Sequence, residues 1–104
     1  MMKKYPVTVK TIKYKEYEIP AVVTVDRKSY FISEVKKEKH HFVFPGGGVG
    51  TKYTVVINKK EKYIFQDKHT QEWHIYHEAG NEPKYMLEEN HHAEITLSDL
   101  DDDN

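Results

Sequence analysis

Cysteine is absent from this 104-residue chain, and that absence removes several kinds of chemistry together. Without thiols there is no cysteine nucleophile, no zinc ribbon and no disulfide framework, and a reducing compartment fits the composition. A chain of this length buries roughly 60 to 70% of the surface that its unfolded form exposes. We therefore expect one domain that folds without disulfides or a structural metal.

Long apolar runs are also missing. Residues 1–20 alternate between polar and apolar side chains, whereas a secretory signal contains a continuous apolar segment. No stretch approaches the roughly 20 apolar residues that a membrane-spanning helix needs. These absences predict a soluble, cytoplasmic protein with no membrane partner.

Residues that favour helices are scarce, and residues that favour strands are abundant. Ala, Leu and Met together number 9, whereas Val, Ile, Thr, Tyr, Phe and Trp number 37. β-Branched and aromatic side chains suit the pleated surface of a sheet. The composition predicts a mostly β fold, a small antiparallel barrel or strongly curled sheet of about five to seven strands, SH3-like or OB-like in size, with at most one short C-terminal helix.

Two β-hairpins of similar chemistry are the clearest local signal. The first pairs residues 21–25 with 29–35 across a turn at 26–28, and the second pairs residues 53–57 with 62–66 across a turn at 58–61. Asp26 and Asn58 suit these turns because each side chain can accept a hydrogen bond from a backbone N–H two residues later. A third turn then leads to a strand at 72–77, which completes a meander.

The segments before and between the hairpins are less regular. Residues 5–19 keep an alternation that slips phase, which predicts one long strand bent by bulges and ending at Pro20. Between the hairpins, a charged stretch at 36–39 and a short strand at 40–44 precede a glycine-rich loop at 45–50. A long bent strand of this kind is typical of a sheet that curls into a barrel.

The signal weakens towards the C-terminus. Asn81 and Pro83 suit the start of a helix, but helix and strand both remain open for residues 82–92. Residues 95–97 read as a strand, and the acidic residues 98–104 as a disordered tail. We therefore expect a single β domain over residues 1–97.

The charges are divided unevenly along the chain, although their sum is only −1. Residues 1–52 carry 11 Lys and Arg against 5 Asp and Glu, and residues 53–104 carry 5 against 12. A basic half is typical of a polyanion partner, and opposite halves also allow self-association. If the halves interleave in one fold, their charges mix on its surface and the division carries no functional meaning.

The glycine-rich loop fails the tests for a nucleotide-binding motif. A dinucleotide fingerprint starting at Gly46 requires glycine where Thr51 stands, and one starting at Gly48 requires glycine where Tyr53 stands. A P-loop requires Gly-Lys-Ser/Thr, and the order at residues 50–52 is Gly-Thr-Lys. We interpret the loop as a strand connection, with a ligand-binding flap as the alternative, and expect no cofactor.

Seven histidines raise the question of a metal site or a catalytic base. His74 and His77 lie three apart in the expected strand, so they point to opposite faces and cannot chelate one ion together. Glu72 shares a face with His74, and His69 precedes them, which leaves a metal site or a general base open. No serine has the context of an activated nucleophile. We assign no catalytic, metal or cofactor-binding residue and expect a protein that is not an enzyme.

Lysines in the first strand indicate where a partner would bind. They all reach one solvent face if a bulge falls near Thr11. Small barrels bind single-stranded nucleic acids through positive grooves with aromatic stacking platforms, but Tyr14 is out of phase with these lysines and is expected in the core. The candidate binding face comprises Lys10, Lys13, Lys15, Gly47, Gly48 and Lys52.

The remaining aromatic residues Trp73, Tyr30, Tyr53 and Tyr63 are expected in the core. With no assembled chemistry, the leading hypothesis is a non-enzymatic interaction module that binds a protein partner or associates with itself. The alternative is a small β-barrel that binds single-stranded nucleic acid. A third hypothesis is a metal-dependent or hydrolytic enzyme.

Overall fold

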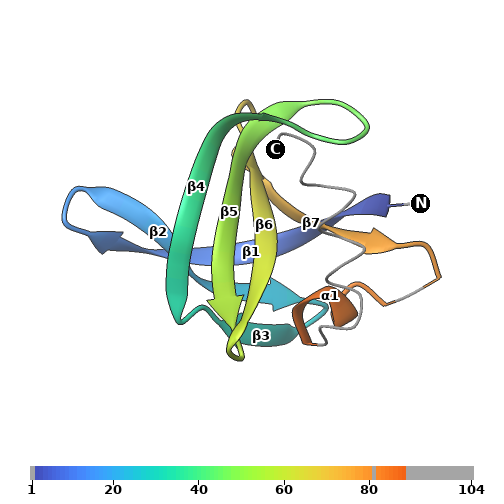
Figure 1. The fold of residues 1–104 in the computed structure, drawn as a ribbon, viewed down its shortest axis with the longest axis horizontal. Coiled ribbons are helices and arrows are strands. Elements are labelled where there is room, and N and C mark those ends of the chain that lie inside the picture. Colours follow the sequence, from blue (N-terminus) through green and yellow to red (C-terminus); the bar gives the residue numbers. More distant parts are fainter. Residues whose placement is uncertain (1, 81, 89–104) are drawn as a thin grey trace.

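The computed structural model of the protein describes residues 2–80 and 82–88. In these ranges the chain forms seven antiparallel strands and one short helix (Figure 1), which confirms the expected mostly β class and curled sheet. In chain order they are β1 (Met2–Tyr14), β2 (Tyr17–Val25), β3 (Lys28–Phe31), β4 (Glu34–Val43), β5 (Val49–Ile57), β6 (Lys60–Asp67), β7 (Trp73–Glu78) and α1 (Tyr85–Glu88). Over the same ranges, no helix has the length and apolar character needed to cross a membrane.

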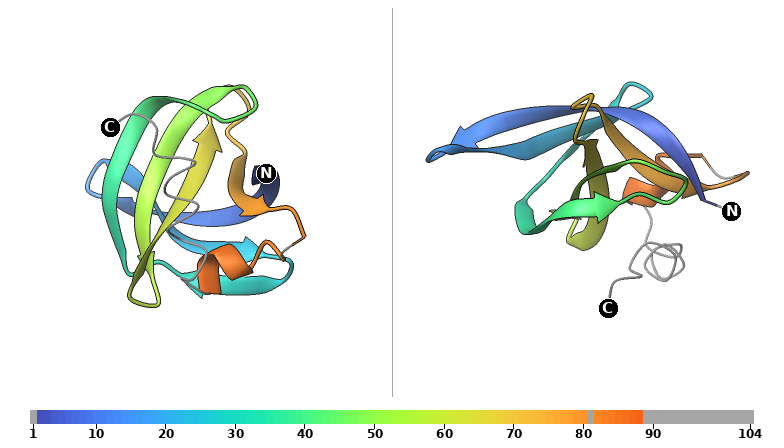
Figure 2. Two further views of the ribbon diagram at one scale, coloured as in Figure 1. Left: turned by 45° about the vertical axis from the view of Figure 1, so that its right-hand side comes forward. Right: turned by 90° about the horizontal axis from the view of Figure 1, so that it is seen from above.

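The strands form one sheet in the order β3-β2-β1-β7-β6-β5-β4. The sheet curls into a half-barrel, which Figure 2 shows from two further directions. Its edge strands β3 and β4 are consecutive in the chain. The two residues that connect them, Ile32 and Ser33, are hydrogen-bonded to β2 and to β5. The amide of Ile32 donates to the carbonyl of Ala21, and the amide of Ser33 donates to the carbonyl of Val56. The curl therefore brings the two ends of the sheet together around one core.

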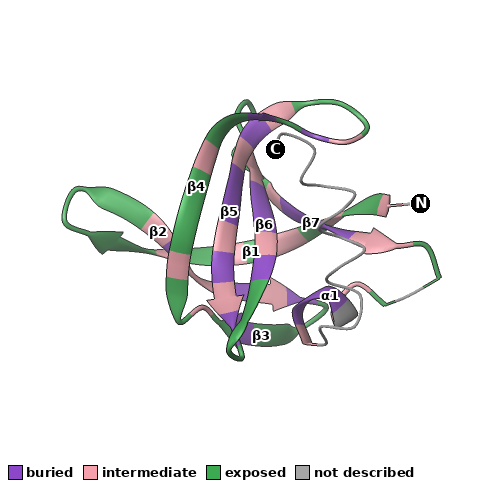
Figure 3. Cartoon of the chain, in the orientation of Figure 1, coloured by how far each residue is buried: buried purple, intermediate pink, exposed green. Residues whose placement is uncertain are grey.

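The main core fills the inner face of the half-barrel. Its residues recur at every second position of β2 and β5, because successive side chains of a strand point to opposite faces (Figure 3). The helix α1 closes the core with Met86 and Leu87, which are 7% and 1% exposed. The buried members are Val23, Val25, Tyr30, Tyr53, Val55, Ile57, Ile64, Ile75, Met86 and Leu87.

A second cluster, which we call the outer aromatic cluster, lies on the opposite face of the sheet. Phe42, Phe44, Phe65 and Tyr76 are buried in it. The glycine-rich loop after β4 supplies one of these rings, since the amide of Phe44 donates to the carbonyl of Gly48 and the loop turns back on itself there. The loop therefore helps to cover the outer face of the sheet.

The four aromatic residues expected in the core all pack against one of the two clusters. Tyr30 and Tyr53 are buried in the main core, and half-buried Trp73 packs against it. Tyr63 is half-buried against the outer aromatic cluster. The aromatic content of the sequence is thus divided between both faces of one sheet.

The prediction of one long bent strand over residues 5–19 is wrong, because the chain reverses at Lys15 and Glu16. β1 and β2 form a hairpin in which Tyr14 lies opposite Tyr17. Lys15 has a φ of 57°, a left-handed conformation of the kind that two-residue hairpin turns use. Neither turn residue is Gly, Asn or Asp, so the sequence carries no turn signal there.

The expected limits of the strands at 29–35 and 40–44 are also wrong. β3 ends at Phe31, and β4 is a single ten-residue strand that includes the charged residues 36–39. Charged side chains are tolerated because β4 lies at an edge of the sheet, where lysines discourage pairing with another chain.

The first turn at Asp26, the second hairpin and the meander are confirmed. Both hairpin turns are shorter than expected, because Val25 already pairs with Lys28 and Ile57 already pairs with Lys60. The helix α1 falls in the segment where helix and strand were both open. The predicted strand at 95–97 and the predicted tail at 98–104 lie outside the described residues.

Candidate functional site

The hairpin of β1 and β2 projects beyond the half-barrel (Figures 1 and 2). β1 pairs with β7 only from Met2 to Val7, and from Thr8 to Tyr14 it pairs with β2. The molecule measures 38 Å along its longest axis, against 26 and 25 Å along the other two. We call residues 8–24 the ribbon. Residues 22–24 also pair with β3, so the part that projects ends at Ala21.

One side of the ribbon exposes large apolar side chains. The cross-strand pairs on this side are Tyr14 with Tyr17, Ile12 with Ile19, and Lys10 with Val22, which in turn pairs with Phe31 of β3. Paired residues share a face, and every second residue returns to it, so all of these side chains lie on the same side of the sheet. Ile12, Tyr14, Tyr17 and Phe31 are 52%, 57%, 70% and 77% exposed, and we call these four residues the ribbon face.

The three lysines expected on one solvent face are all exposed, but they are not on one face. The pairing register shifts near the expected position, yet the extra residue, Ala21, belongs to β2, so β1 keeps its alternation. Lys10 therefore lies beside the ribbon face, whereas Lys13 lies opposite Glu18 on the other side. Lys15 stands in the turn at the tip of the ribbon.

The other residues of the expected binding face lie elsewhere. Gly47 and Gly48 belong to the loop between β4 and β5, far from the tip of the ribbon (Figures 1 and 2). Lys52 is 6% exposed, and its Nζ lies 4.5 Å from the ring centre of Tyr63 and 5.1 Å from that of Phe42. Cation–π contacts of this kind stabilise a desolvated ammonium, so Lys52 serves packing. The structure does not gather the six residues into one site.

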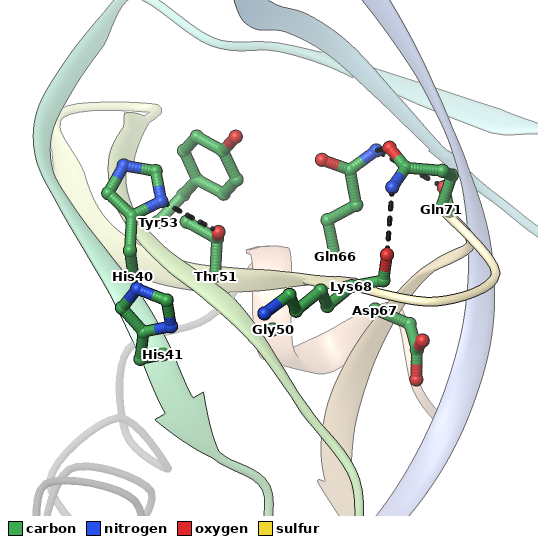
Figure 4. A pocket seen from close by; sticks show the side chains of 9 residues that line it. All are labelled: His40, His41, Gly50, Thr51, Tyr53, Gln66, Asp67, Lys68 and Gln71. Carbon is green, nitrogen blue, oxygen red and sulfur yellow. Dashed lines mark hydrogen bonds between the residues drawn. The ribbon is translucent and has the colours of Figure 1, made fainter.

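A polar pocket lies between the end of β4, the start of β5 and the turn after β6 (Figure 4). Its volume is about 330 Å³. Nδ1 of His40 lies 3.1 Å from Oγ1 of Thr51, and Nε2 of Gln71 donates to the carbonyl of Lys68. The lining residues are His40, His41, Gly50, Thr51, Tyr53, Gln66, Asp67, Lys68 and Gln71.

Asp67 shapes the turn at one side of this pocket. Its Oδ1 accepts hydrogen bonds from the backbone amides of His69 and Thr70, at 2.7 and 3.0 Å. These bonds, that of Thr70 most strongly, hold the pKa of Asp67 below its usual value. In Figure 4 the carboxylate points away from the side chains of His41 and Lys68. Asp67 therefore acts as an ionised cap of the turn.

His74 is a buried titratable residue enclosed by the outer aromatic cluster. It is 4% exposed, and its ring centre lies 4.8 Å from that of Phe44, 5.4 Å from that of Phe65 and 5.0 Å from that of Tyr76. Its Nε2 has no hydrogen-bond partner among the described residues. Burial, helped by the positive charge of Lys4, lowers the pKa of His74 to about 4. The imidazole is therefore neutral at pH 7.

The residues considered for catalysis or metal binding lie in different surroundings. His74 is enclosed by rings, while Glu72 is exposed to solvent. Within residues 2–80 and 82–88, no group of three or more His, Cys, Asp or Glu side chains could hold a metal ion. The described surface offers instead an apolar contact area on the ribbon and polar groups in the pocket.

Comparison with known proteins adds no family or fold relative, because the chain has no significant match to a family model, a curated protein or a solved structure. The ribbon face was also missed by the sequence, which placed Tyr14 in the core. A usable signal is present: charged residues flank Tyr14 and Tyr17 on both sides, as is typical of a strand exposed on both faces.

Proposed function

We propose that the protein is a non-enzymatic interaction module that docks a protein partner on the ribbon face. The observation that carries this proposal is the exposure of Ile12, Tyr14 and Tyr17 on one side of a projecting hairpin, with Phe31 of the adjacent strand β3 exposed on the same side. With about 200 Å² for each large side chain, their exposed fractions leave on the order of 500 Å² of apolar surface. The largest apolar patch on a typical monomeric protein has about this size and is often functional.

Single-stranded nucleic acid is the second candidate partner. Tyr14 and Tyr17 stand near lysines, and aromatic rings with lysines can stack on bases and contact phosphates. The charge of the ribbon favours a protein instead, because Glu16 and Glu18 offset its lysines. Phosphate contacts dominate nucleic-acid affinity, and carboxylates beside them oppose binding.

The partner is expected to pack on the face of the ribbon rather than to extend the sheet. The long edge strand β4 pairs with β5 through a register that shifts twice, so its backbone is a poor template for another strand. Bulges and lysines are the devices that protect edge strands from such pairing. The ribbon face instead presents side chains that can be buried without new backbone hydrogen bonds.

Removing two aromatic anchors is expected to weaken partner binding without unfolding the protein. Tyr17 and Phe31 are both mostly exposed, so each change to serine should alter stability by about 0.5 kcal/mol or less. Aromatic anchors at the centre of an interface are worth about 2 kcal/mol or more each. In Tyr17→Ser/Phe31→Ser, capture of the partner from native lysate should fall at least about tenfold.

Val43→Ser is the matched control, since Val43 is 70% exposed but lies on β4, away from the ribbon face. Captured protein and captured nucleic acid are both measured. A protein lost from the double variant and retained by Val43→Ser supports the proposal. Equal capture by both variants argues against it, and a captured nucleic acid that dissociates steeply with salt supports the second candidate.

A further inference from the structure

The polar pocket at the end of β4 occupies a position where barrels commonly hold ligands. Thr51, Tyr53 and Gln66 line it from the inner side of β5 and β6, so it lies at one end of the half-barrel. Tyr53 is 7% exposed, and its ring centre lies 5.2 Å from that of Trp73. Ligand sites occur preferentially at the mouths of β-barrels, where packed strands fix the lining side chains.

The backbone around this pocket is strained at two places. Outside the turns of the three tight hairpins, only two non-glycine residues in the described ranges have a positive φ, His41 at 59° and Gln71 at 66°. Both of them line the pocket. The left-handed conformation is unfavourable for a residue with a Cβ, and strained residues cluster at ligand sites, where they aim a side chain. The coincidence points to a binding role for the pocket.

The pocket contains two nitrogen groups that the rest of the described chain leaves without a partner. No hydrogen bond or ion pair within the described ranges engages Nζ of Lys68 or the imidazole of His41. In Figure 4 the side chain of Lys68 extends across the pocket towards His41. The nearby acids are engaged: Asp67 caps the turn, and Glu38 lies 3.4 Å from His40. The Asp67 carboxylate points away from Lys68 and His41, so these two nitrogen groups can face a ligand in the pocket.

We propose that this pocket binds a small oxyanion, the phosphate or carboxylate group of a small molecule, between Lys68 and His41. The ammonium supplies positive charge, and the imidazole supplies a directional N–H donor. A volume of about 330 Å³ suits a ligand at the small end of the usual range. The site is separate from the ribbon face and does not depend on the function proposed for it.

Titration of the protein with inorganic phosphate and with acetate, at neutral pH and constant ionic strength, tests this site. We expect saturable NMR shifts of the amides of Thr51, Gln66 and Lys68 with at least one of the two anions. Lys68→Gln should weaken that binding at least about tenfold, because it removes the charge-assisted hydrogen bond. His41→Asn should weaken it too without disturbing the backbone, since asparagine tolerates a positive φ.

Lys13→Gln is the matched control, because Lys13 is an exposed lysine of the ribbon. It should bind the anion as the parent does. Shifts that fail to saturate with both anions would overturn the proposal, and so would equal affinities of Lys68→Gln and Lys13→Gln. Both changes are at exposed side chains, so a preserved spectrum shows that the fold is intact.

Discussion

Replacing Gly50 by alanine is expected to lower the free energy of unfolding by about 3 kcal/mol or more. Gly50 lies in β5 between Phe42 of β4 and Asp67 of β6. A Cβ at this position would stand 2.0 Å from the carbonyl oxygen of Gln66 and 2.7 Å from Cζ of Phe44. The first of these atoms belongs to the backbone of the neighbouring strand, so the clash is relieved only if the β5–β6 ladder opens.

Gly46→Ala is the control for this effect. Gly46 has a φ of 86°, and among the described residues, its two chain neighbours aside, no heavy atom lies within 4 Å of the place where its Cβ would stand. Gly46→Ala should therefore lower the free energy of unfolding only by the cost of a left-handed backbone at alanine, about 1 to 2 kcal/mol. Urea unfolding of both variants measures the difference. If Gly50→Ala is as stable as Gly46→Ala, the close approach of β5 to β6 at Gly50 is not a constraint on the fold.

Stability is expected to fall between pH 6.5 and pH 4 because of His74. Burial, together with the charge of Lys4, lowers the pKa of His74 from 6.5 to about 4. In this window the unfolded chain binds a proton at His74 and the folded protein does not. The stability that the folded protein has with a neutral His74 is therefore fully present above pH 6.5, and it is lost as the pH falls through the window. The lowering of the pKa from 6.5 to about 4 corresponds to a loss of about 3 kcal/mol in the free energy of unfolding.

His74→Phe should remove this pH dependence. A phenyl ring suits the aromatic surroundings, and Nε2 has no hydrogen-bond partner among the described residues to lose. Stability at neutral pH should stay within about 1.5 kcal/mol of the parent. Urea unfolding across the window should then show a flatter profile for the variant than for the parent. Parallel losses in the parent and His74→Phe would exclude His74 as the titrating group.

The predictable part of the fold is the part that has one buried face. The inner positions of β5 before the turn at Asn58 are Tyr53, Val55 and Ile57, and all three are buried, as the two-residue period of a strand predicts. The position of Trp73 against the core followed from the same period. In these strands the hydrophobic pattern and the turn chemistry agree, so local sequence was sufficient.

The ribbon and β4 could not be predicted because neither has a simple buried face. Much of the ribbon is exposed, so its alternation does not report a core, and the turn at Lys15 lacks the residues that favour turns. β4 carries charged residues along most of its length because it is an edge strand. The charged residues 36–39 have no apolar alternation, so the sequence alone does not show that they belong to a strand paired with β5.

The candidate sites depend on pairing register, which the sequence did not provide. The ribbon face depends on the register in which Val22 of β2 pairs with Lys10 of β1 and with Phe31 of β3, which places residues of three strands on one side of the sheet. Lys52 reads as a surface lysine, but the register places it opposite Phe65, in the outer aromatic cluster. The polar pocket likewise needs three separate segments, brought together by bulged strands and one turn.

Photo-crosslinking from two equally exposed positions tests the ribbon face most directly. Tyr17 and Val43 are each 70% exposed, but only Tyr17 belongs to the ribbon face. A photo-reactive residue in place of Tyr17 should form a crosslink to a protein in native lysate, and the same residue in place of Val43 should not. Crosslinks of equal yield from both positions, or none from position 17, would contradict a docking role for the ribbon.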